Sequence, residues 1–218
     1  MKISVIIPVL NEEKAIYASL EDLFLKHLPD EVIVVDGGSA DQTVPLAGEW
    51  TQVIMSQKGR ARQLNEGVRR ATGDILLFLH ADTKLPEDGL VWIKQAIDEG
   101  AEGGRFRLRF DNPRWLLRFY ELATRFHLFS YGDQGFFVRR RVFELLGGFR
   151  ENTAREDLDF YQRLSRMTRP VIIKEPVTAS GRKFQALGAC VRKFSRLLWA
   201  ALYYFSGRLL QSKEPLHP

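Results

Sequence analysis

Short apolar runs alternate with longer amphipathic stretches along the first hundred residues. The apolar runs predict strands at 3–7, 32–35, 53–55 and 75–79, and the stretches between and after them predict helices at 13–26, 43–49, 60–70 and 90–99. In the first helix, Ile16, Leu20 and Leu23 recur at helical spacing and form one apolar face. Strands that are apolar throughout are buried on both faces, so this half predicts a doubly wound α/β fold with a parallel sheet.

The pattern changes after residue 103. Three apolar residues alternate with three arginines from 105 to 110, which predicts a strand with one buried and one polar face, either antiparallel or at a sheet edge. Helices are predicted at 115–129 and 156–167, a strand near 135–138, and a further helix that ends at Gly147.

The positive charge is concentrated near the end of the chain. The sequence has 32 basic and 27 acidic residues, a net charge of +5, and no acidic residue lies between Glu175 and Glu214. In the same segment the apolar residues between Phe194 and Leu209 share a helical face. This composition predicts an amphipathic helical tail over 181–218 that either packs on its own domain or lies on an anionic membrane surface. The longest apolar run, 197–205, is shorter than the roughly 20 residues that span a bilayer.

Several classes of protein are disfavoured by what the sequence lacks. The single cysteine, Cys190, cannot form an internal disulfide, and the first apolar run is interrupted by Pro8 without a signal-peptide cleavage site. We therefore expect a cytoplasmic protein, with the inner face of the cell membrane as an alternative location. No nucleic-acid-binding motif accompanies the basic tail, so no nucleic-acid partner is expected. The glycine motifs of dinucleotide oxidoreductases and of P-loop phosphotransferases do not occur.

Polar residues follow each of the first four predicted strands. In an open parallel sheet, ligands bind beyond the carboxyl ends of the strands, so these residues predict a site with both carboxylates and cations at one rim. In chain order the candidates are Pro8, Asn11, Glu12, Asp36, Gly38, Lys58, Arg60, Arg62, His80 and Asp82.

Four ordered segments of the chain resemble glycosyltransferase family 2, the inverting nucleotide-sugar transferases of the GT-A fold. They are VIIPVLNE at 5–12, VVDGGSAD at 34–41, GDILLFLHAD at 73–82 and EDLD at 156–159. The resemblance implies a mixed α/β sheet flanked by helices, in a single domain over 1–180. Residues 1–100 would form its nucleotide-binding half and 101–180 its acceptor half. More closely, the chain is similar to a small bacterial branch associated with arsenosugar or selenium gene sets, and to transferases that glycosylate the carotenoid acid diaponeurosporenoate.

The resemblance also implies how the donor is held. Pro8, Asn11 and Glu12 would line the nucleoside pocket with Gly38 nearby, and Asp36 would accept a hydrogen bond from uracil or guanine of a UDP- or GDP-sugar. Local chemistry offers alternatives for two of these residues. Asp36 is also suited to the turn before Gly38, and Glu12 to the start of a helix.

The family's metal-binding motif, D-X-D, stands here as His80-Ala81-Asp82. The resemblance makes Asp82 the ligand of Mn²⁺ or Mg²⁺. His80 would contact the ribose or the metal, or would be structural, and an imidazole suits manganese better than magnesium. Arg60 begins a predicted helix, where a cation and the helix terminus would together attract phosphate. A solvated surface role is the alternative for Lys58 and Arg62.

The last of the four segments supplies the candidate catalytic base. By the resemblance, Asp157 removes a proton from the acceptor, and Glu156 supports it. Two acids at a helix start would also simply stabilise the helix dipole. The acceptor hydroxyl or carboxyl is unidentified, and a lipid-like acceptor, such as a carotenoid acid or polyprenyl phosphate, follows if the tail contacts a membrane. The alternatives to a glycosyltransferase are a noncatalytic nucleotide-sugar or membrane-binding protein and a nucleotidyltransferase.

Overall fold

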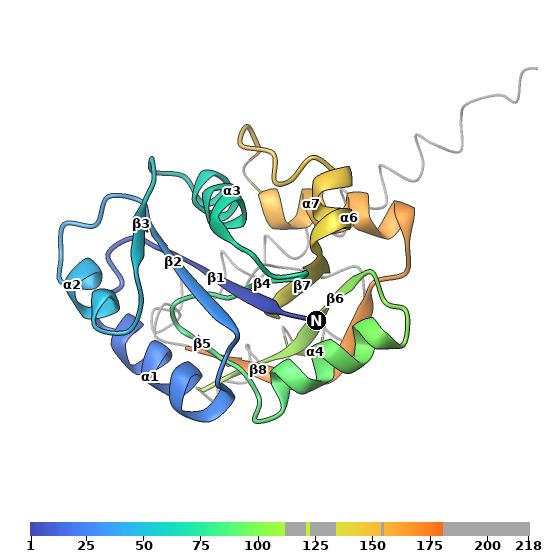
Figure 1. Ribbon diagram of the computed structural model, residues 1–218, viewed down its shortest axis with the longest axis horizontal. Helices are drawn as coiled ribbons and strands as arrows, with labels where there is room; N and C mark the ends of the chain where they lie inside the picture. The colour runs from blue at the N-terminus through green and yellow to red at the C-terminus, as the bar shows by residue number, and fades with distance from the viewer. Residues whose placement is uncertain (112–120, 123–133, 154, 181–218) are drawn as a thin grey trace, which may run out of the picture.

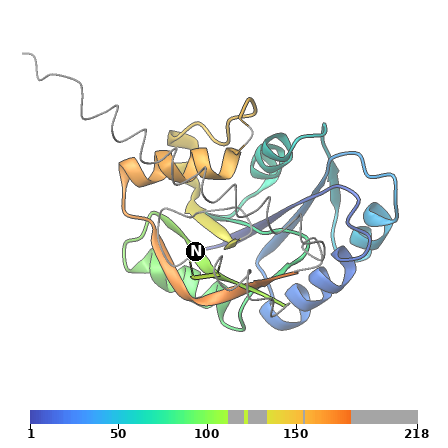
Figure 2. The ribbon, with the colours of Figure 1, turned by 180° about the vertical axis from the view of Figure 1, so that it is seen from behind.

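The computed structural model describes residues 1–111, 121–122, 134–153 and 155–180. Within these ranges, helices pack on both faces of one mixed sheet (Figures 1 and 2), whose eight strands follow the order β3-β2-β1-β4-β7-β6-β8-β5. The strands are β1 (Ile3–Val9), β2 (Glu31–Asp36), β3 (Val53–Met55), β4 (Ile75–Phe78), β5 (Thr83–Lys84), β6 (Gly103–Phe110), β7 (Phe136–Arg139) and β8 (Val171–Ala179). The helices are α1 (Ile16–His27), α2 (Thr43–Gly48), α3 (Arg60–Arg70), α4 (Gly89–Asp98), α6 (Arg140–Leu145) and α7 (Glu156–Met167). The predicted α/β architecture is confirmed.

The amino-terminal half of the sheet is parallel, as the alternation of strands and helices predicts. β1 pairs in parallel with β2 on one side and with β4 on the other, and β3 pairs in parallel with β2. Parallel strands bring their carboxyl ends to the same edge of a sheet. The segments that follow Val9, Asp36 and Phe78 therefore meet at one rim.

The carboxyl-terminal half of the sheet is mixed. β7 is antiparallel to both β4 and β6, and β6 is parallel to β8. β8 then pairs with the short strand β5, with Thr83 opposite Ala179. Beyond this pair the Ser180 amide donates a hydrogen bond of 3.0 Å to the backbone oxygen of Asp82. The carboxyl ends of β6 and β8 thus reach the same rim as Asp82.

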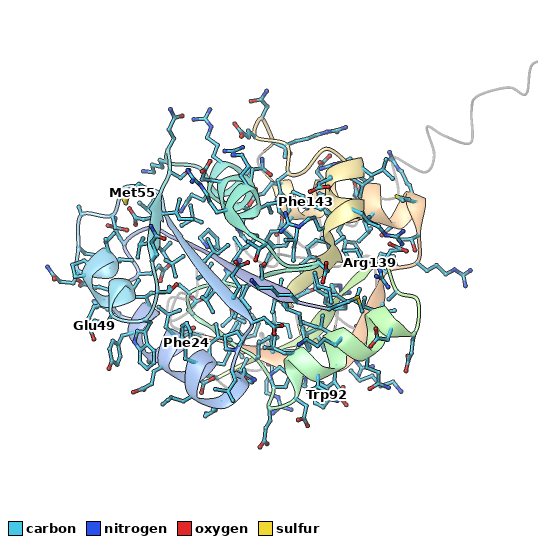
Figure 3. The ribbon with its side chains drawn as sticks, viewed as in Figure 1. Phe24, Glu49, Met55, Trp92, Arg139 and Phe143 are labelled. Carbon is cyan, nitrogen blue, oxygen red and sulfur yellow. The ribbon has the colours of Figure 1, made fainter. Side chains whose placement is uncertain are left out.

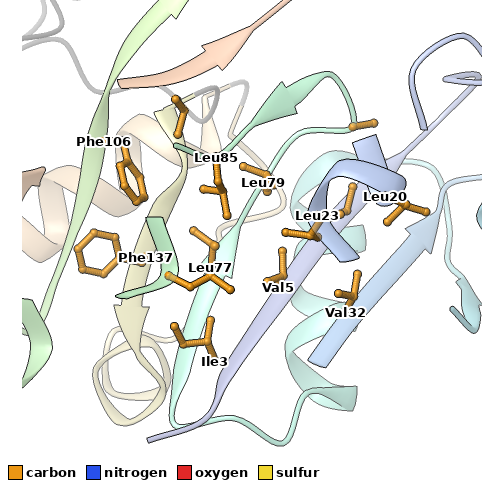
Figure 4. Packing of buried hydrophobic residues seen from close by; sticks show 14 of the residues in the cluster. Ile3, Val5, Leu20, Leu23, Val32, Leu77, Leu79, Leu85, Phe106 and Phe137 are labelled. Atoms are coloured by element: carbon orange, nitrogen blue, oxygen red, sulfur yellow. The ribbon is translucent and has the colours of Figure 1, made fainter. Parts of the chain in front are cut away.

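Two hydrophobic cores lie on opposite faces of the sheet. The first core, between the sheet and helices α1, α2 and α4, includes Val5, Leu20 and Leu77 (Figure 4). Val5 and Ile6 are both fully buried but belong to different cores, because neighbouring side chains on a strand point to opposite faces. This double burial is the reason that β1 is apolar throughout.

The second core is rich in aromatic rings and lies between the sheet and helices α3, α6 and α7. Ring centroids are 4.9 Å apart for Phe78 and Phe149 and 5.1 Å apart for Phe143 and Phe160. Figure 3 labels Phe143 in this layer and Trp92 of α4 in the opposite one. Aromatic pairs of this kind contribute about 0.5–1.5 kcal/mol beyond the area that they bury. They fix α7 against the sheet.

Some expected elements differ from those in the structure. β6 does not lie at an edge, because β7 and β8 flank it; its antiparallel pairing with β7 agrees with the prediction. The first helix begins at Ile16 rather than at residue 13, since the preceding residues form a turn in which the Ala15 amide donates to the oxygen of Glu12. β5 and β8 were not predicted. The helix expected at 115–129 and the tail at 181–218 lie outside the described residues.

Candidate functional site

A pocket of about 340 Å³ opens at the carboxyl ends of β1 and β4, beside the amino terminus of α3. We call it the rim pocket, and it is lined by Pro8, Val9, Leu10, Glu12, Lys58, Gly59, Arg60, Gln63, His80, Ala81 and Asp82. It brings together six of the predicted site residues from three separate segments of the chain, namely Pro8, Glu12, Lys58, Arg60, His80 and Asp82.

Asn11 and Gly38 lie on the two loops beside the pocket, and hydrogen bonds fasten these loops together. Asn11 has a left-handed backbone, with φ of 54°, and its Oδ1 accepts from the amide of Ala40 at 2.9 Å. The Asn11 amide donates to Oγ of Ser39, also at 2.9 Å. Gly38 is exposed, with φ of 95° and open space where a Cβ would stand. The loops are therefore held in place by the protein itself, and one of them offers bare backbone to the solvent.

Asp36 lies beneath these loops rather than on the pocket wall. Its side chain is fully buried, and its Oδ2 accepts hydrogen bonds from the amides of Gly38 at 2.7 Å and Ser39 at 2.8 Å. This is the turn-forming role that local chemistry offers as the alternative to base recognition. A nucleobase would reach Asp36 only if this turn opened, and base recognition by Asp36 stays a prediction.

Gln63 is a pocket residue that the sequence analysis missed. Its side chain is buried, and Nε2 donates to the backbone oxygens of Val9 at 2.7 Å and Val35 at 2.9 Å. It therefore joins the ends of β1 and β2 from the first turns of α3. The available signal is a polar residue on the buried face of an amphipathic helix, between Ala61 and Leu64.

Arg60 connects the rim pocket to the start of α7. Its Nε lies 3.3 Å from Oε1 of Glu156, and its Nη2 contacts Nε2 of His80. Because a guanidinium only donates hydrogen bonds, Nε2 of His80 is the acceptor in this contact. The lone pair on Nε2 through which His80 would bind a metal is therefore already engaged by Arg60.

Glu156 is nearly buried in this arrangement, with 11% of its side chain exposed. Burial raises the pKa of Glu156 above its ordinary value, Arg60 opposes the increase, and the negative charge of Asp157 adds to it. Burial has the largest effect because removing a carboxylate from water disfavours its ionised form. A protonated Glu156 does not neutralise Arg60. Because burial favours the protonated form of Glu156, more of the positive charge of Arg60 is available to another anion.

Asp157 is half-buried at the start of α7, next to Glu156. Its Oδ1 accepts a hydrogen bond of 2.8 Å from the amide of Leu158. Asp157 does not line the rim pocket itself, but the contact between Arg60 and Glu156 places its helix end alongside. The structure thus brings the fourth sequence segment to the same rim as the other three.

Asp82 is the carboxylate through which the rim pocket would hold a metal. Within the described residues, no group of three or more His, Cys, Asp or Glu side chains is placed to bind a metal ion. Mg²⁺ and similar hard cations are commonly held by one or two carboxylates together with substrate phosphates. A single carboxylate at a pocket wall fits a metal of that kind, bound jointly with a phosphate ligand and not by the protein alone.

The two other candidate cations have different surroundings. Lys58 is exposed and lines the rim pocket. Arg62 points elsewhere, since its Nε pairs with Oε2 of Glu151 at 3.0 Å and its Nη1 donates to Gln57. In the part of the chain that the structure covers, no helix is long and apolar enough to cross a bilayer.

Comparison with known proteins points to one family. Residues 4–154 match the family model described as glycosyl transferase family 2. A probable glycosyltransferase of Bacillus subtilis (strain 168), YdaM, is 26% identical over 194 residues, covering 75% of this chain and 46% of that protein. Staphylococcus aureus TarS 1–349, solved with UDP-GlcNAc, has a TM-score of 0.68 at 23% identity, covering 84% of this chain and 59% of that chain. Glucosyl-3-phosphoglycerate synthase from Mycobacterium tuberculosis was solved with Mn²⁺, UDP and glucosyl-3-phosphoglycerate. It has a TM-score of 0.61 at 22% identity, covering 92% of this chain and 79% of that chain.

These matches differ in what they show. The chain spans about half the length of YdaM, with 46% of that protein covered. The two solved structures are similar in fold, a GT-A type α/β sheet flanked by helices. The family model covers more than half of the chain, and its range contains the whole rim pocket. The chain belongs to glycosyl transferase family 2.

Proposed function

We propose that the protein is an inverting glycosyltransferase that moves one sugar from a UDP- or GDP-sugar to an acceptor hydroxyl or carboxyl. The observation that carries this proposal is the contact of Arg60 with both His80 and Glu156. It joins a pocket suited to a nucleoside diphosphate to the helix end that bears the candidate base. A noncatalytic nucleotide-sugar-binding protein would need the pocket but not this connection.

The donor would lie in the rim pocket with its nucleoside against Pro8 and Glu12 and its diphosphate toward Arg60. Arg60 stands at the first residue of α3, where the helix terminus adds a partial positive charge. Asp82 would hold Mn²⁺ or Mg²⁺ against the diphosphate. When bound, the metal neutralises charge that develops on the leaving group.

In the reaction, the acceptor oxygen forms a bond to the anomeric carbon while the bond from that carbon to the diphosphate oxygen breaks. The nucleoside diphosphate leaves with the bonding electrons. For a hydroxyl acceptor, Asp157 takes the proton as the oxygen attacks. Attack from the side opposite the leaving group inverts the configuration at the anomeric carbon.

The acceptor and the location of the protein follow from the proposal less directly. A lipid-like acceptor, such as a carotenoid acid or polyprenyl phosphate, would suit a protein whose basic tail contacts the inner face of a membrane. The tail lies outside the described residues, so its sequence alone supports this part. Cosedimentation of the full chain with anionic vesicles, compared with neutral vesicles, tests the membrane contact.

The donor is tested by calorimetry or thermal shift on the purified chain with a panel of UDP- and GDP-sugars, with and without Mn²⁺. A ligand that binds only the folded state raises its stability by mass action. We expect one nucleotide to bind, with higher affinity when Mn²⁺ is present. A panel without any bound nucleotide would contradict the proposal.

Product analysis separates the proposal from its two rivals. A glycosyltransferase consumes the donor and releases a nucleoside diphosphate once the acceptor is supplied. A nucleotidyltransferase instead joins a sugar phosphate to a nucleoside triphosphate and releases pyrophosphate. A noncatalytic binding protein leaves the donor unchanged.

A further inference from the structure

Strand β6 carries three arginines on one face, and the function proposed above uses none of them. The apolar residues at 106, 108 and 110 of β6 are buried in the first core. Side chains alternate along a strand, so the arginines face the opposite side of the sheet, on which α7 packs. These residues are Arg105, Arg107 and Arg109.

The first of the three is part of the packing. Arg105 is fully buried, and its guanidinium carbon lies 5.7 Å from the ring centroid of Tyr161 on α7. Its Nη1 donates to the backbone oxygen of Phe106 at 3.3 Å. Arg105 is therefore held by the protein, and it marks where α7 crosses β6.

Arg107, the second of the three, lacks such contacts. Its Nε is buried and has no hydrogen-bond partner. Among the arginines at buried or half-buried positions in the described ranges, Arg107 stands apart because it has neither an ion pair nor a hydrogen bond. Removing the Nε–H group from water without an acceptor costs stability, and no hydrogen bond or ion pair within the described residues offsets this cost. An anionic ligand would supply the missing acceptor.

The register of α7 on β6, extended by one step, leads from Arg107 toward the start of α7. Near the carboxyl end of α7, a Cβ on Gly103 would lie 3.2 Å from Leu164, and one step further Arg105 meets Tyr161. The next step along both elements leads to Arg107 on the strand and Asp157 on the helix. This step advances about 6.6 Å along β6 and about 6 Å along α7, so extending the register pairs these two positions. No ion pair joins Arg107 to Asp157 within the described residues.

The end of the same arginine row lies near Asp82. Arg109 is opposite Thr178 of β8, and Thr178 is opposite Lys84 of β5, which follows Asp82 by two residues. Two strand spacings separate these backbones, about 10 Å in all. Arg109 is exposed at this end. The arginine row therefore runs from beneath α7, at Arg105, toward the rim at which the donor would bind.

We infer that Arg107, with Arg109 beside it, binds an anionic group of the acceptor, either a phosphate monoester or a carboxylate. This inference rests on the proposed function and narrows it to negatively charged acceptors. The bound group would hold the acceptor between Asp157 and the donor, with its attacking oxygen toward the anomeric carbon. The anion itself is bound by charge-assisted hydrogen bonds to the guanidinium.

The test measures the binding of inorganic phosphate and of acetate to the full chain by calorimetry, in the presence of saturating UDP and Mn²⁺. Arg107→Met is compared with the unmodified chain, with Arg107→Lys and with a control, Arg166→Met, which changes an exposed arginine at the far end of α7. We expect at least one of the two probes to bind, and its affinity to fall at least tenfold in Arg107→Met. The affinity should fall less in Arg107→Lys, and Arg166→Met should leave it unchanged.

The results identify the anionic group and test the role of Arg107. Phosphate binding that depends on Arg107 identifies a phosphate monoester, whereas acetate binding identifies a carboxylate. Equal affinities in the unmodified chain and Arg107→Met, or binding of neither probe, would overturn the inference. Thermal unfolding adds a second readout, since Arg107→Met should melt no lower than the unmodified chain if the arginine serves a ligand; a large loss would assign it to packing. If UDP fails to bind while anion binding still depends on Arg107, the proposed function is wrong and the anion site stands.

Discussion

Arg60 at the rim pocket and Arg107 on β6 are both cations that are partly removed from water, and the protein treats them differently. Arg60 is paired with Glu156 and contacts His80. Arg107 has no ion pair or hydrogen bond within the described residues. In the function proposed above, charge on the donor side would be arranged before any ligand binds, whereas charge on the acceptor side would need an anion to complete it.

The loops on the two sides repeat this difference. On the donor side, the side chains of Asn11, Asp36 and Ser39 each accept a hydrogen bond from a backbone amide, and these bonds fix the loops after β1 and β2. On the acceptor side, the described face of β6 presents its arginines at increasing exposure, from Arg105 to Arg109. A fixed donor site lowers the cost of ordering the protein when the nucleotide binds.

The largest expected effect is that of replacing Asp157, the candidate base, which should alter sugar transfer but not donor binding. In Asp157→Asn, we expect sugar transfer to fall more than about a hundredfold, because general-base catalysis typically contributes 10²–10⁴-fold. Affinity for the nucleotide sugar should remain unchanged, since Asp157 does not line the rim pocket. Rate measurements at saturating donor, together with calorimetry of donor binding, check both parts. Asp98→Asn on α4 provides a control at an exposed carboxylate on the opposite face. Full activity in Asp157→Asn would remove the base assignment.

The second change tests whether the donor side depends on a metal. In Asp82→Ala, affinity for the donor in the presence of Mn²⁺ should fall about thirtyfold, or ~2 kcal/mol, because the metal can no longer bridge the protein and the diphosphate. Titrations with and without a chelator provide the measurement. Donor affinity that responds neither to the chelator nor to the substitution would count against a metal at Asp82.

A third change tests the positioned cation on the donor side. Arg60→Ala should weaken UDP binding about tenfold, or ~1.4 kcal/mol, since a hydrogen bond to a charged group is lost. Arg62→Ala is the matched control, because Arg62 lies two residues further along α3 and pairs with Glu151. Both affinities can be measured by calorimetry. Equal losses in the two variants would show that only general positive charge matters at this helix end.

The smallest expected effect concerns Glu156, the partner of Arg60. Its raised pKa means that the folded protein holds this proton more tightly than the unfolded chain does. The stability that this supplies is complete below the ordinary glutamate pKa and is lost as pH rises through the folded value. Relative to the unmodified protein, Glu156→Gln should therefore become more stable as pH rises from 4 to 8. Melting temperatures of the two proteins over this pH range measure the difference, and a pH-independent difference would refute burial of Glu156 as its cause.

Much of the fold was predictable because burial on both faces leaves a clear pattern. β3 and α3 have the predicted bounds, β6 begins two residues before the predicted strand, and α7 begins at Glu156 as its acidic first turn suggests. β8 was missed because half-buried and exposed positions replace a regular alternation, with Lys174 and Glu175 at an irregularity in its pairing with β6. β5 has two residues, too few to leave a pattern.

The candidate site was predictable in its members but not in their contacts. Segment order placed Asp82 and Arg60 at one rim, because parallel strands end at the same edge. No pattern in the sequence could show that Arg60 pairs with Glu156, since that contact depends on how α7 packs across the second core. The burial of Asp36 beneath its own turn likewise depends on the path of the loop.

The hydrogen bond from the Ser180 amide to the backbone of Asp82 gives the pocket a reporter at the end of the described chain. Residues 181–218 begin one peptide bond beyond this amide. Deuterium uptake at Ser180 should slow when a nucleotide and a metal hold Asp82 in place. Truncation before Ser180 would remove this bond, so shortened versions of the protein are best cut after it.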